Sequence, residues 1–457
     1  MIADHGGNVF EISNLIKIPA NRIIDFSSSI NPFGPPSNVI DSIKNHLDLI
    51  KLYPDRKYSK LREALANYLE ISSDGIIVGC GTTELIHSIL ARFVRNEVII
   101  PLPNFSEYEA AAKALDLNTI FIHPYGIKIN FNDLINFIDK ASPHGAIVLC
   151  NPNNPTGEVL ESKKIIEVIE RAEDKGIIVI LDEAYHELSE EAESLIKRSF
   201  EFSNLFVLRS LTKPFGFPGL RVGYCICHPN LAKKFEATAI SWRVGILEEI
   251  AAISAINDKD FLKFSKERLT SAKKRFFESL KSIDGLKPID SGANFFMIDI
   301  SNSGFSPRNL KWRLLSYALL IRDLTSVKGL PNIYIRVATR REEENLLLLE
   351  ALDNIINSMK KIYPNNPICM ERKCHKYVFD CRLCFCPFYP CLDETTGGKF
   401  IERETEGIVW SCIDCTWVHR VEVADKILEE LADIDIKKVD PEAILRIKRQ
   451  IMEEFQP

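Results

Sequence analysis

Short runs of Val, Ile and Leu alternate with longer amphipathic segments over residues 61–224, and this alternation sets the fold class. Continuous apolar runs of this length are typical of strands that are buried on both faces of a parallel sheet. The segments between them have helical periodicity, as at 83–93, where Leu85, Ile89 and Phe93 share one face. We therefore expect an α/β fold with three layers, in which helices cover both faces of a mostly parallel sheet. The predicted strands are 76–78, 97–100, 119–122, 146–150, 177–181, 205–208 and 222–226.

The rest of the chain has a different organisation. Beyond the alternating region, a long polar helix (260–282) precedes two strands (294–300 and 333–337) and two further helices (307–317 and 342–359), which predicts a smaller α+β domain. A Pro/Asn-rich linker then separates this region from a cysteine-rich segment. The expected units are an N-terminal segment (1–45) that joins the small domain, a large domain (46–245), the small domain (246–362), a cysteine-rich module (366–422) and a helical tail (423–457).

The composition is that of a globular protein without a membrane or nucleic-acid footprint. The 457 residues carry a formal net charge of −6, and 46% of them are hydrophobic. The first eight residues lack the basic and apolar regions of a signal peptide, and no apolar stretch reaches the roughly 18–20 residues of a membrane span. We expect a cytoplasmic protein that binds neither membranes nor nucleic acid.

The Gly/Pro-rich loop after residues 205–208 places Lys213 three residues after Ser210 and eight before Arg221. A lysine amine forms a Schiff base with a carbonyl group, and pyridoxal 5'-phosphate is the cofactor that uses this reaction. The cofactor's phosphate dianion needs donors such as a hydroxyl and a guanidinium group. Taken alone, the loop is also typical of solvated surface segments, because lysine is abundant there. The remaining motifs therefore decide between the two interpretations.

Further motifs lie after predicted strands, where ligands of open α/β sheets bind. The turn at 79–83 offers glycine backbone and a helix N-terminus to a phosphate group. Asn154 can donate to a phenolate oxygen, and Asp182 can keep a pyridine nitrogen protonated. Tyr185 can share the phenolate, and Tyr108 can stack on the ring. Each also has a purely structural alternative: a Pro/Asn turn, a helix N-cap or a packed tyrosine.

Arg336, in the predicted strand 333–337, is placed to grip a carboxylate in bidentate fashion. In this order, the motifs resemble the fold type I pyridoxal-phosphate-dependent aminotransferase superfamily, over residues 1 to about 360. The resemblance implies that Lys213 is the Schiff-base lysine and proton shuttle, with Asp182 and Tyr185 as its catalytic partners. It also implies that Tyr53 reaches the cofactor phosphate of a second subunit, in a homodimer with shared active sites. The other implied cofactor contacts are Gly81, Thr82, Thr83, Tyr108, Asn154, Ser210 and Arg221.

The opening residues 5–8 and the segment 27–34 are similar to those of threonine-phosphate decarboxylases. The resemblance implies decarboxylation of L-threonine O-3-phosphate to (R)-1-aminopropan-2-yl phosphate for cobalamin biosynthesis. The alternative is transamination of histidinol phosphate with 2-oxoglutarate, because histidinol-phosphate aminotransferases are similar as well. The sequence leaves both open, since the bond that breaks depends on which substituent of Cα stands perpendicular to the cofactor ring. The implied substrate contacts are His5, Gly6, Asn31, Asn154, Arg322 and Arg336.

Eight cysteines between residues 369 and 415, including two C-x-x-C pairs, predict a metal site. Thiolates bind zinc and iron–sulfur clusters alike, and zinc is favoured here. A region of about 60 residues has little apolar core, so a metal would supply much of its stability. Two alternatives are a binding module that uses Trp410, Trp417, His419 and Arg420, and a second activity such as a threonine kinase. The candidate ligands are Cys369, Cys374, Cys381, Cys384, Cys386, Cys391, Cys412 and Cys415.

Overall fold

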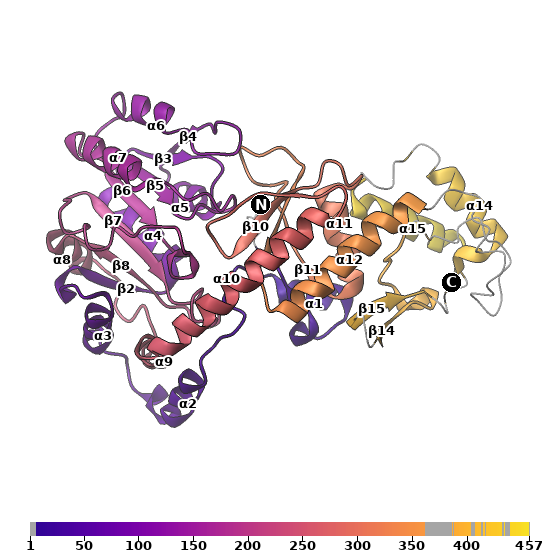
Figure 1. Ribbon diagram of the computed structural model, residues 1–457, viewed down its shortest axis with the longest axis horizontal. Helices are drawn as coiled ribbons and strands as arrows, with labels where there is room; N and C mark the ends of the chain where they lie inside the picture. The colour runs from indigo at the N-terminus through magenta and orange to yellow at the C-terminus, as the bar shows by residue number, and fades with distance from the viewer. Residues whose placement is uncertain are drawn as a thin grey trace.

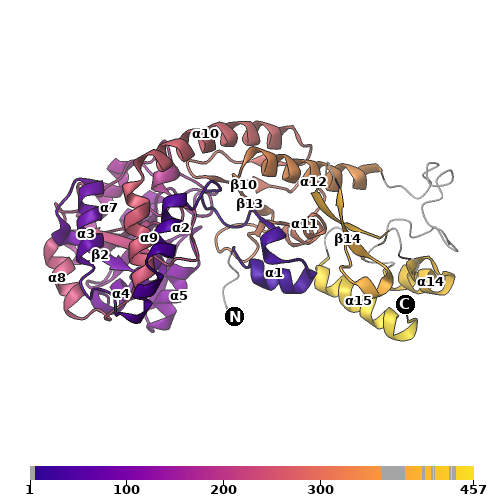
Figure 2. The same cartoon turned by 90° about the horizontal axis from the view of Figure 1, so that it is seen from below.

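The computed structural model describes residues 6–361, 386, 388–403, 407–412, 415, 417–431, 434 and 439–456. Figure 1 shows three parts in a row: a large sheet with its helices, a smaller sheet, and the C-terminal cysteine-rich region. The 24-residue helix α10 (Lys259–Ser282) runs along the first two parts and joins them (Figure 2). Within the described residues, every helix is too short or too polar to cross a bilayer.

The large sheet confirms the expected mostly parallel architecture. Its seven strands lie in the order β2-β8-β7-β6-β5-β3-β4, and β8 alone runs antiparallel to its neighbours. All seven predicted strands are present, with ends that differ by at most two residues. They are β2 (Ile76–Gly79), β3 (Glu97–Pro101), β4 (Asn118–Ile122), β5 (Ala146–Cys150), β6 (Ile178–Asp182), β7 (Leu205–Ser210) and β8 (Gly223–Cys227).

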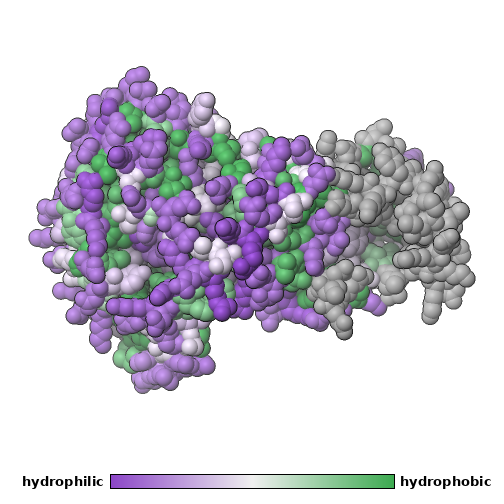
Figure 3. All heavy atoms as spheres, viewed as in Figure 1, coloured by the Kyte–Doolittle hydropathy of each residue, from purple (hydrophilic) through white to green (hydrophobic). Residues whose placement is uncertain are grey.

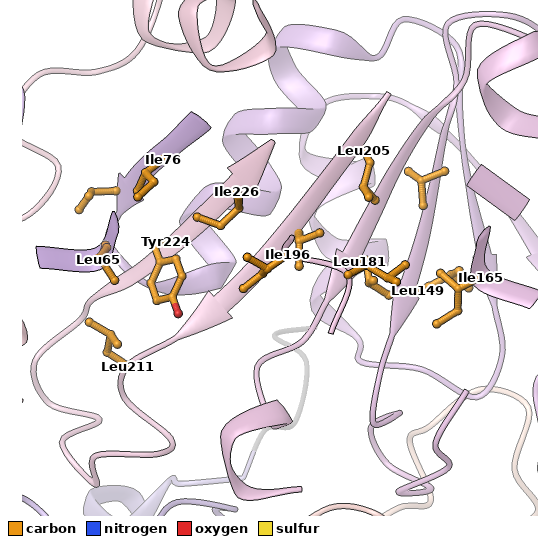
Figure 4. Packing of buried hydrophobic residues seen from close by; sticks show 14 of the residues in the cluster. Leu65, Ile76, Leu149, Ile165, Leu181, Ile196, Leu205, Leu211, Tyr224 and Ile226 are labelled. Carbon is orange, nitrogen blue, oxygen red and sulfur yellow. The ribbon is translucent and has the colours of Figure 1, made fainter. Parts of the chain in front are cut away.

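Successive strand residues point to opposite faces of this sheet and build two cores. Ile147 and Leu149 of β5 belong to one apolar cluster, and Ala146 and Val148 belong to the other. Figure 4 shows the first cluster, in which Leu149 lies near Leu181 and Ile165. The first face is covered by α3 (Ser59–Leu69), α6 (Phe131–Ile138), α7 (Ser162–Asp174) and α9 (Ile246–Asn257), and the second by α4 (Gly81–Phe93), α5 (Glu107–Ala114) and α8 (Pro229–Ala237).

The small domain is built on a four-stranded antiparallel sheet with the order β12-β13-β10-β9. A separate parallel pair, β1 with β11, brings the N-terminal segment beside it. The helix expected at 307–317 ends as an α-helix at Leu314 and continues as a single 3-10 turn. The elements are α1 (Val9–Ile16), β1 (Ile24–Asp25), β9 (Lys287–Pro288), β10 (Phe295–Asp299), α11 (Pro307–Leu314), η5 (Leu315–Tyr317), β11 (Leu319–Leu320), β12 (Arg322–Asp323), β13 (Tyr334–Ala338) and α12 (Glu342–Lys361).

The C-terminal region contains a hairpin and two helices around a core of its own. The Asp440 side chain caps the last helix by accepting a hydrogen bond from the Glu442 amide at 3.1 Å. Trp410 and Trp417, which the binding-module alternative treats as partner contacts, are buried in this core. That part of the alternative is wrong, because the module uses both indoles to build its interior. The elements are β14 (Lys399–Arg403), β15 (Gly407–Ser411), α14 (Val421–Glu430) and α15 (Pro441–Glu454).

Candidate active site

A pocket lies at the carboxyl ends of β5, β6 and β7, where the small domain faces the large sheet. This is where open α/β sheets bind their ligands. The N-terminal segment and the β12–β13 pair supply its other wall. Most of the residues singled out in the sequence line it: Gly6, Thr82, Thr83, Tyr108, Asn154, Asp182, Tyr185, Ser210, Lys213, Arg221, Arg322 and Arg336.

Lys213 lies in the pocket on the loop that follows β7. Burial lowers the pKa of its amine to about 8, and the positive charges of Arg336 and Arg221 act in the same direction. Asp182 opposes this shift, but less strongly. A substantial fraction of the amine is therefore neutral near pH 8, which is the form that attacks a carbonyl group.

One end of the pocket is suited to a phosphate dianion. The N-terminus of α4 carries Thr82 and Thr83, which both line the pocket, and Arg221 lies against it. Gly81 itself lies just behind the lining, with a φ of +77°, and a Cβ there would meet Nη2 of Arg221 at 2.7 Å. Glycine suits this position, because the positive φ would strain any residue with a side chain. Ser210 completes this end, with its hydroxyl 2.8 Å from that of Thr212.

The opposite end holds a buried carboxylate. Asp182 accepts hydrogen bonds from the Tyr108 hydroxyl at 2.7 Å and from the Ala184 amide at 3.0 Å. Burial raises the pKa of Asp182, and these hydrogen bonds counteract that effect. Burial likewise raises the pKa of Tyr185 to about 12, so its phenol stays protonated. This end therefore offers one carboxylate and one hydroxyl donor to a polar heterocycle.

Two arginines lie side by side on neighbouring strands of the small-domain sheet. Arg322 and Arg336 are register partners in β12 and β13, and both line the pocket. Arg336 donates through Nη2 to the Ser27 carbonyl at 2.8 Å and through Nη1 to Oδ1 of Asn154. Burial and the charge of Arg322 lower the pKa of Arg336. Two cations this close favour a ligand with two negative groups.

Two of the predicted contacts, Asn31 and Tyr53, lie outside the described pocket lining. Asn31 is buried, but its Nδ2 donates to the Pro214 carbonyl at 2.7 Å, and its backbone amide donates to the Lys213 carbonyl at 2.8 Å. It thus holds the lysine loop in place and is absent from the described pocket lining. Tyr53 is 80% exposed and packs on Trp242, with a ring separation of 4.8 Å. His5 lies outside the described residues.

A buried ion network behind the pocket escaped the sequence analysis. Arg209 bonds Glu183 through Nε at 2.9 Å, Glu187 through Nη1 at 2.5 Å and Ser194 through Nη2 at 2.7 Å. Its side chain and both carboxylates are almost fully buried. Arg209 directly precedes Ser210, so the alternation along β7 turns it away from the pocket. This network leaves little signal in the sequence, because the predicted strand 205–208 ends one residue before Arg209.

Four of the candidate metal ligands are described: Cys386, Cys391, Cys412 and Cys415. They belong to or pack against the module core. A hydrogen bond with Cys412 lowers the pKa of Cys391, and the charge of Lys448 has the same effect. Within the described part of the chain, no three His, Cys, Asp or Glu side chains are arranged to hold a metal ion. The described thiols can therefore supply only part of a ligand set. Cys369, Cys374, Cys381 and Cys384 lie outside the described residues.

Comparison with known proteins identifies both parts of the chain. Residues 21–352 match the family described as aminotransferase class I and II, and residues 361–440 match the cysteine-rich small domain family. A Caldanaerobacter subterraneus subsp. tengcongensis protein, provisionally named a threonine-phosphate decarboxylase, is 35% identical over 76% of this chain and 93% of its own. Histidinol-phosphate aminotransferase 2 of Archaeoglobus fulgidus is 32% identical over 74% of this chain and 94% of its own.

A solved structure agrees with these matches. The histidinol-phosphate aminotransferase from Clostridium acetobutylicum superimposes with a TM-score of 0.68 at 31% identity, covering 74% of this chain and all of that one. The family supports pyridoxal 5'-phosphate as the cofactor. The pocket residues fit it, since they combine a reactive lysine, a phosphate-binding helix N-terminus and a buried carboxylate. Through residues 21–352, the chain belongs to the aminotransferase class I and II family.

Proposed function

We propose that this chain is a pyridoxal-phosphate-dependent carboxy-lyase that converts L-threonine O-3-phosphate to (R)-1-aminopropan-2-yl phosphate, a step of cobalamin biosynthesis. The observation that carries the proposal is the pair Arg322 and Arg336, which line the same pocket as Lys213. A phosphorylated amino acid brings one phosphate and one carboxylate, which is one anion for each guanidinium group. We assign the carboxylate to Arg336 and the phosphate to Arg322, together with Gly6 and His5.

The residues divide the remaining work. Ser210, Arg221 and the start of α4 hold the cofactor phosphate, while Asn154 and Tyr185 donate to its phenolate. When bound, the cofactor supplies an electron sink for the charge that remains on Cα once CO2 has left. Asp182 keeps the pyridine nitrogen protonated, and Tyr108 packs against the ring. Lys213 returns a proton to Cα, because its lowered pKa suits both loss and gain of a proton near neutrality.

Transamination of histidinol phosphate is the second candidate, and the 32% identity with such an enzyme favours it. Among the described lining residues, Asp182 is the one carboxylate, and we assign it to the cofactor. The described lining therefore offers no second carboxylate to pair with the imidazolium group of histidinol phosphate. This favours the decarboxylase.

Direct assays separate the two reactions. The purified holoenzyme should release CO2 from L-threonine O-3-phosphate without added 2-oxo acid, in a 1:1 ratio with the amino alcohol phosphate. Formation of glutamate from histidinol phosphate and 2-oxoglutarate, without CO2 release in the first assay, would overturn the proposal.

A homodimer with shared active sites accounts for the apolar surface around Tyr53. Figure 3 shows apolar atoms on the projecting lobe that carries α2 (Ser37–Asn45). Leu47, Ile50 and Trp242 are exposed on the surrounding segments, an arrangement typical of an interface. Tyr53 would then contact the cofactor phosphate of the other subunit. Sedimentation should give a dimer, and Tyr53→Phe should weaken cofactor binding while the dimer persists. A monomer with full activity would contradict this assignment.

The cysteine-rich module would hold zinc in preference to an iron–sulfur cluster. The supporting observations are its thiol donors and the interaction between Cys391 and Cys412. Metal analysis of the purified protein tests the assignment. Bound zinc, with no visible absorbance beyond that of the cofactor, agrees with the assignment. Bound iron with broad visible absorbance would show an iron–sulfur cluster and overturn it. The threonine-kinase alternative is tested by an assay with threonine and ATP.

A further inference from the structure

The cysteine-rich module together with the helical tail, here called the module, packs in its described residues from 386 onward against an apolar cluster that contains the N-terminal helix. Leu392, Phe400 and Ile408 pack against the apolar cluster that contains α1 residues Ile12 and Ile16. The same cluster includes residues of η5 and β11. Trp312 of α11 also donates through Nε1 to the Pro390 carbonyl at 3.1 Å. Figure 2 shows α1 lying beside the module. The module is therefore packed onto the elements that carry one wall of the pocket.

Two segments of that wall lie next to elements of this cluster: the loop with Gly6 precedes α1, and Ser27 follows β1. Gly6, which lines the pocket, lies just before α1, and a Cβ at Gly6 would meet the Ser27 carbonyl oxygen at 2.4 Å. The Gly7 amide donates to the Ser27 hydroxyl at 2.9 Å, so this loop lies directly on Ser27. Ser27 follows β1, which pairs with β11. The cluster that contains α1 and β11, and against which Leu392 packs, therefore connects the module to Gly6 and Ser27.

Arg308 makes a polar connection to β12, the third segment that contributes to this wall of the pocket. It lies in the first turn of α11, with Nη1 3.0 Å from Asp440 of the module and Nε 3.8 Å from Asp323. A cation is unfavourable near a helix N-terminus, so these two carboxylates are what stabilise it there. Asp323 is buried and directly follows Arg322 in β12. One guanidinium group therefore joins the module to the strand that carries an anion-binding arginine.

The module end of this connection leads to the cysteines. Asp440 caps α15, and Lys448 of the same helix is buried with Nζ 2.6 Å from the carboxylate of Asp393. Asp393 lies two residues after Cys391. A continuous series of contacts thus runs from the cysteine loop through α15 and Arg308 to Asp323.

We propose that the cysteine-rich module positions the anion-binding wall of the pocket and that Arg308 is its positioning residue. The wall formed by Gly6, Ser27 and Arg322 must meet a phosphate group at a fixed place, and small misplacements weaken such contacts strongly. The cofactor is held mainly by residues of the large domain, such as Lys213 and Asp182. Loosening the module should therefore raise the KM for a phosphorylated substrate while cofactor binding stays unchanged.

The test is a double-mutant cycle on the holoenzyme with Arg308→Gln, Asp440→Asn and both changes together. Asparagine caps helices as well as aspartate does, so Asp440→Asn removes the ion pair and keeps α15 intact. Each single variant should raise KM about three- to fivefold with kcat within about twofold, and the double variant should add little. Arg275→Gln is the matched control. Its side chain is also 58% exposed and bonds Glu342 at 2.9 Å, away from the module and the pocket lining.

The inference rests on the proposed function only in that the substrate carries a phosphate group. The assays use L-threonine O-3-phosphate or histidinol phosphate, whichever the wild type turns over. If the wild type turns over neither, the proposed function is rejected, but the inference is not. Hydrogen exchange then decides the inference without turnover: Arg308→Gln should speed exchange across residues 319–327 relative to Arg275→Gln. An unchanged KM, a loss of bound cofactor, or unchanged exchange in that segment would overturn the positioning role.

Discussion

The hydroxyl of Tyr108 lies 2.7 Å from Oδ2 of Asp182 and donates a hydrogen bond to it inside the pocket. Tyr108 lies in α5 and Asp182 in β6, and the two residues are 74 positions apart in the chain. From the sequence, Tyr108 is expected to stack on the pyridine ring of the cofactor and Asp182 to pair with the ring nitrogen. The structure joins them, so the tyrosine also influences the charge of the carboxylate.

Tyr108→Phe should separate these two tasks. Phenylalanine keeps a ring in place but removes the hydrogen bond, and that bond lowers the pKa of Asp182. The carboxylate then becomes easier to protonate, and kcat should fall about tenfold, as expected for loss of one hydrogen bond to a charged group. Steady-state kinetics measures the effect, and Tyr108→Ala, which also loses the ring, should be worse. A kcat equal to that of the wild type would show that the hydrogen bond plays no part in turnover.

The pKa of Lys213 predicts how cofactor capture depends on pH. The folded, cofactor-free protein holds this pKa at about 8, below its ordinary value of 10.5, because the amine is buried near Arg336 and Arg221. The neutral amine therefore accumulates as pH rises through 8, and the initial rate of combination with pyridoxal phosphate should level off above about pH 9. Stopped-flow absorbance measures this rate. Arg336→Gln should move the midpoint upward, since it removes one positive charge. A midpoint near 10 in the unmodified protein would contradict the prediction.

The same pKa has a consequence for stability. Between about pH 8 and 10.5, the unfolded chain binds more protons at Lys213 than the folded chain does, so the cofactor-free protein should become more stable as pH rises through this window. Lys213→Met removes the titrating group and should flatten that part of the curve. Thermal unfolding of the two cofactor-free proteins at several pH values compares them. Parallel curves would show that Lys213 does not titrate in this range.

Local patterns predicted the large sheet well, because each buried strand is a short apolar run and each motif follows a strand. What the sequence could not predict depends on contacts between distant segments. Asn31 resembled a substrate contact, yet its amide bonds the Pro214 carbonyl, 183 residues away. Arg209 lies directly after the predicted strand 205–208, and only the fold brings Glu183 and Glu187, which are 26 and 22 residues earlier in the chain, beside it. The docking of the cysteine-rich module likewise depends on surface complementarity, which leaves no periodic signal.

Arg209→Met should be severely destabilising. The substitution leaves Glu183 and Glu187 buried without their cation, a change that typically costs about 3–5 kcal/mol. The urea midpoint of unfolding should fall accordingly. Arg198→Met is the control, because its ion pair with Glu201 is largely exposed and should matter by less than about 1 kcal/mol. Equal midpoints for the two variants would show that the buried network adds no net stability.

Asn31→Ala tests whether this residue serves the lysine loop or the substrate. The Asn31 side chain forms two hydrogen bonds within the protein: Nδ2 donates to the Pro214 carbonyl, and Oδ1 accepts from the Phe33 amide. Loss of such buried hydrogen bonds typically costs about 1–3 kcal/mol, and here the cost falls on the loop that carries Lys213. Cofactor capture should slow and kcat should fall, whereas the KM for the phosphorylated substrate should stay within about twofold. Asn31→Asp keeps the acceptor for Phe33 but sets a buried carboxylate oxygen against the Pro214 carbonyl, so it should be at least as damaging as alanine. The opposite result, a raised KM with normal cofactor capture, would return Asn31 to the substrate-binding role that the sequence motif implied.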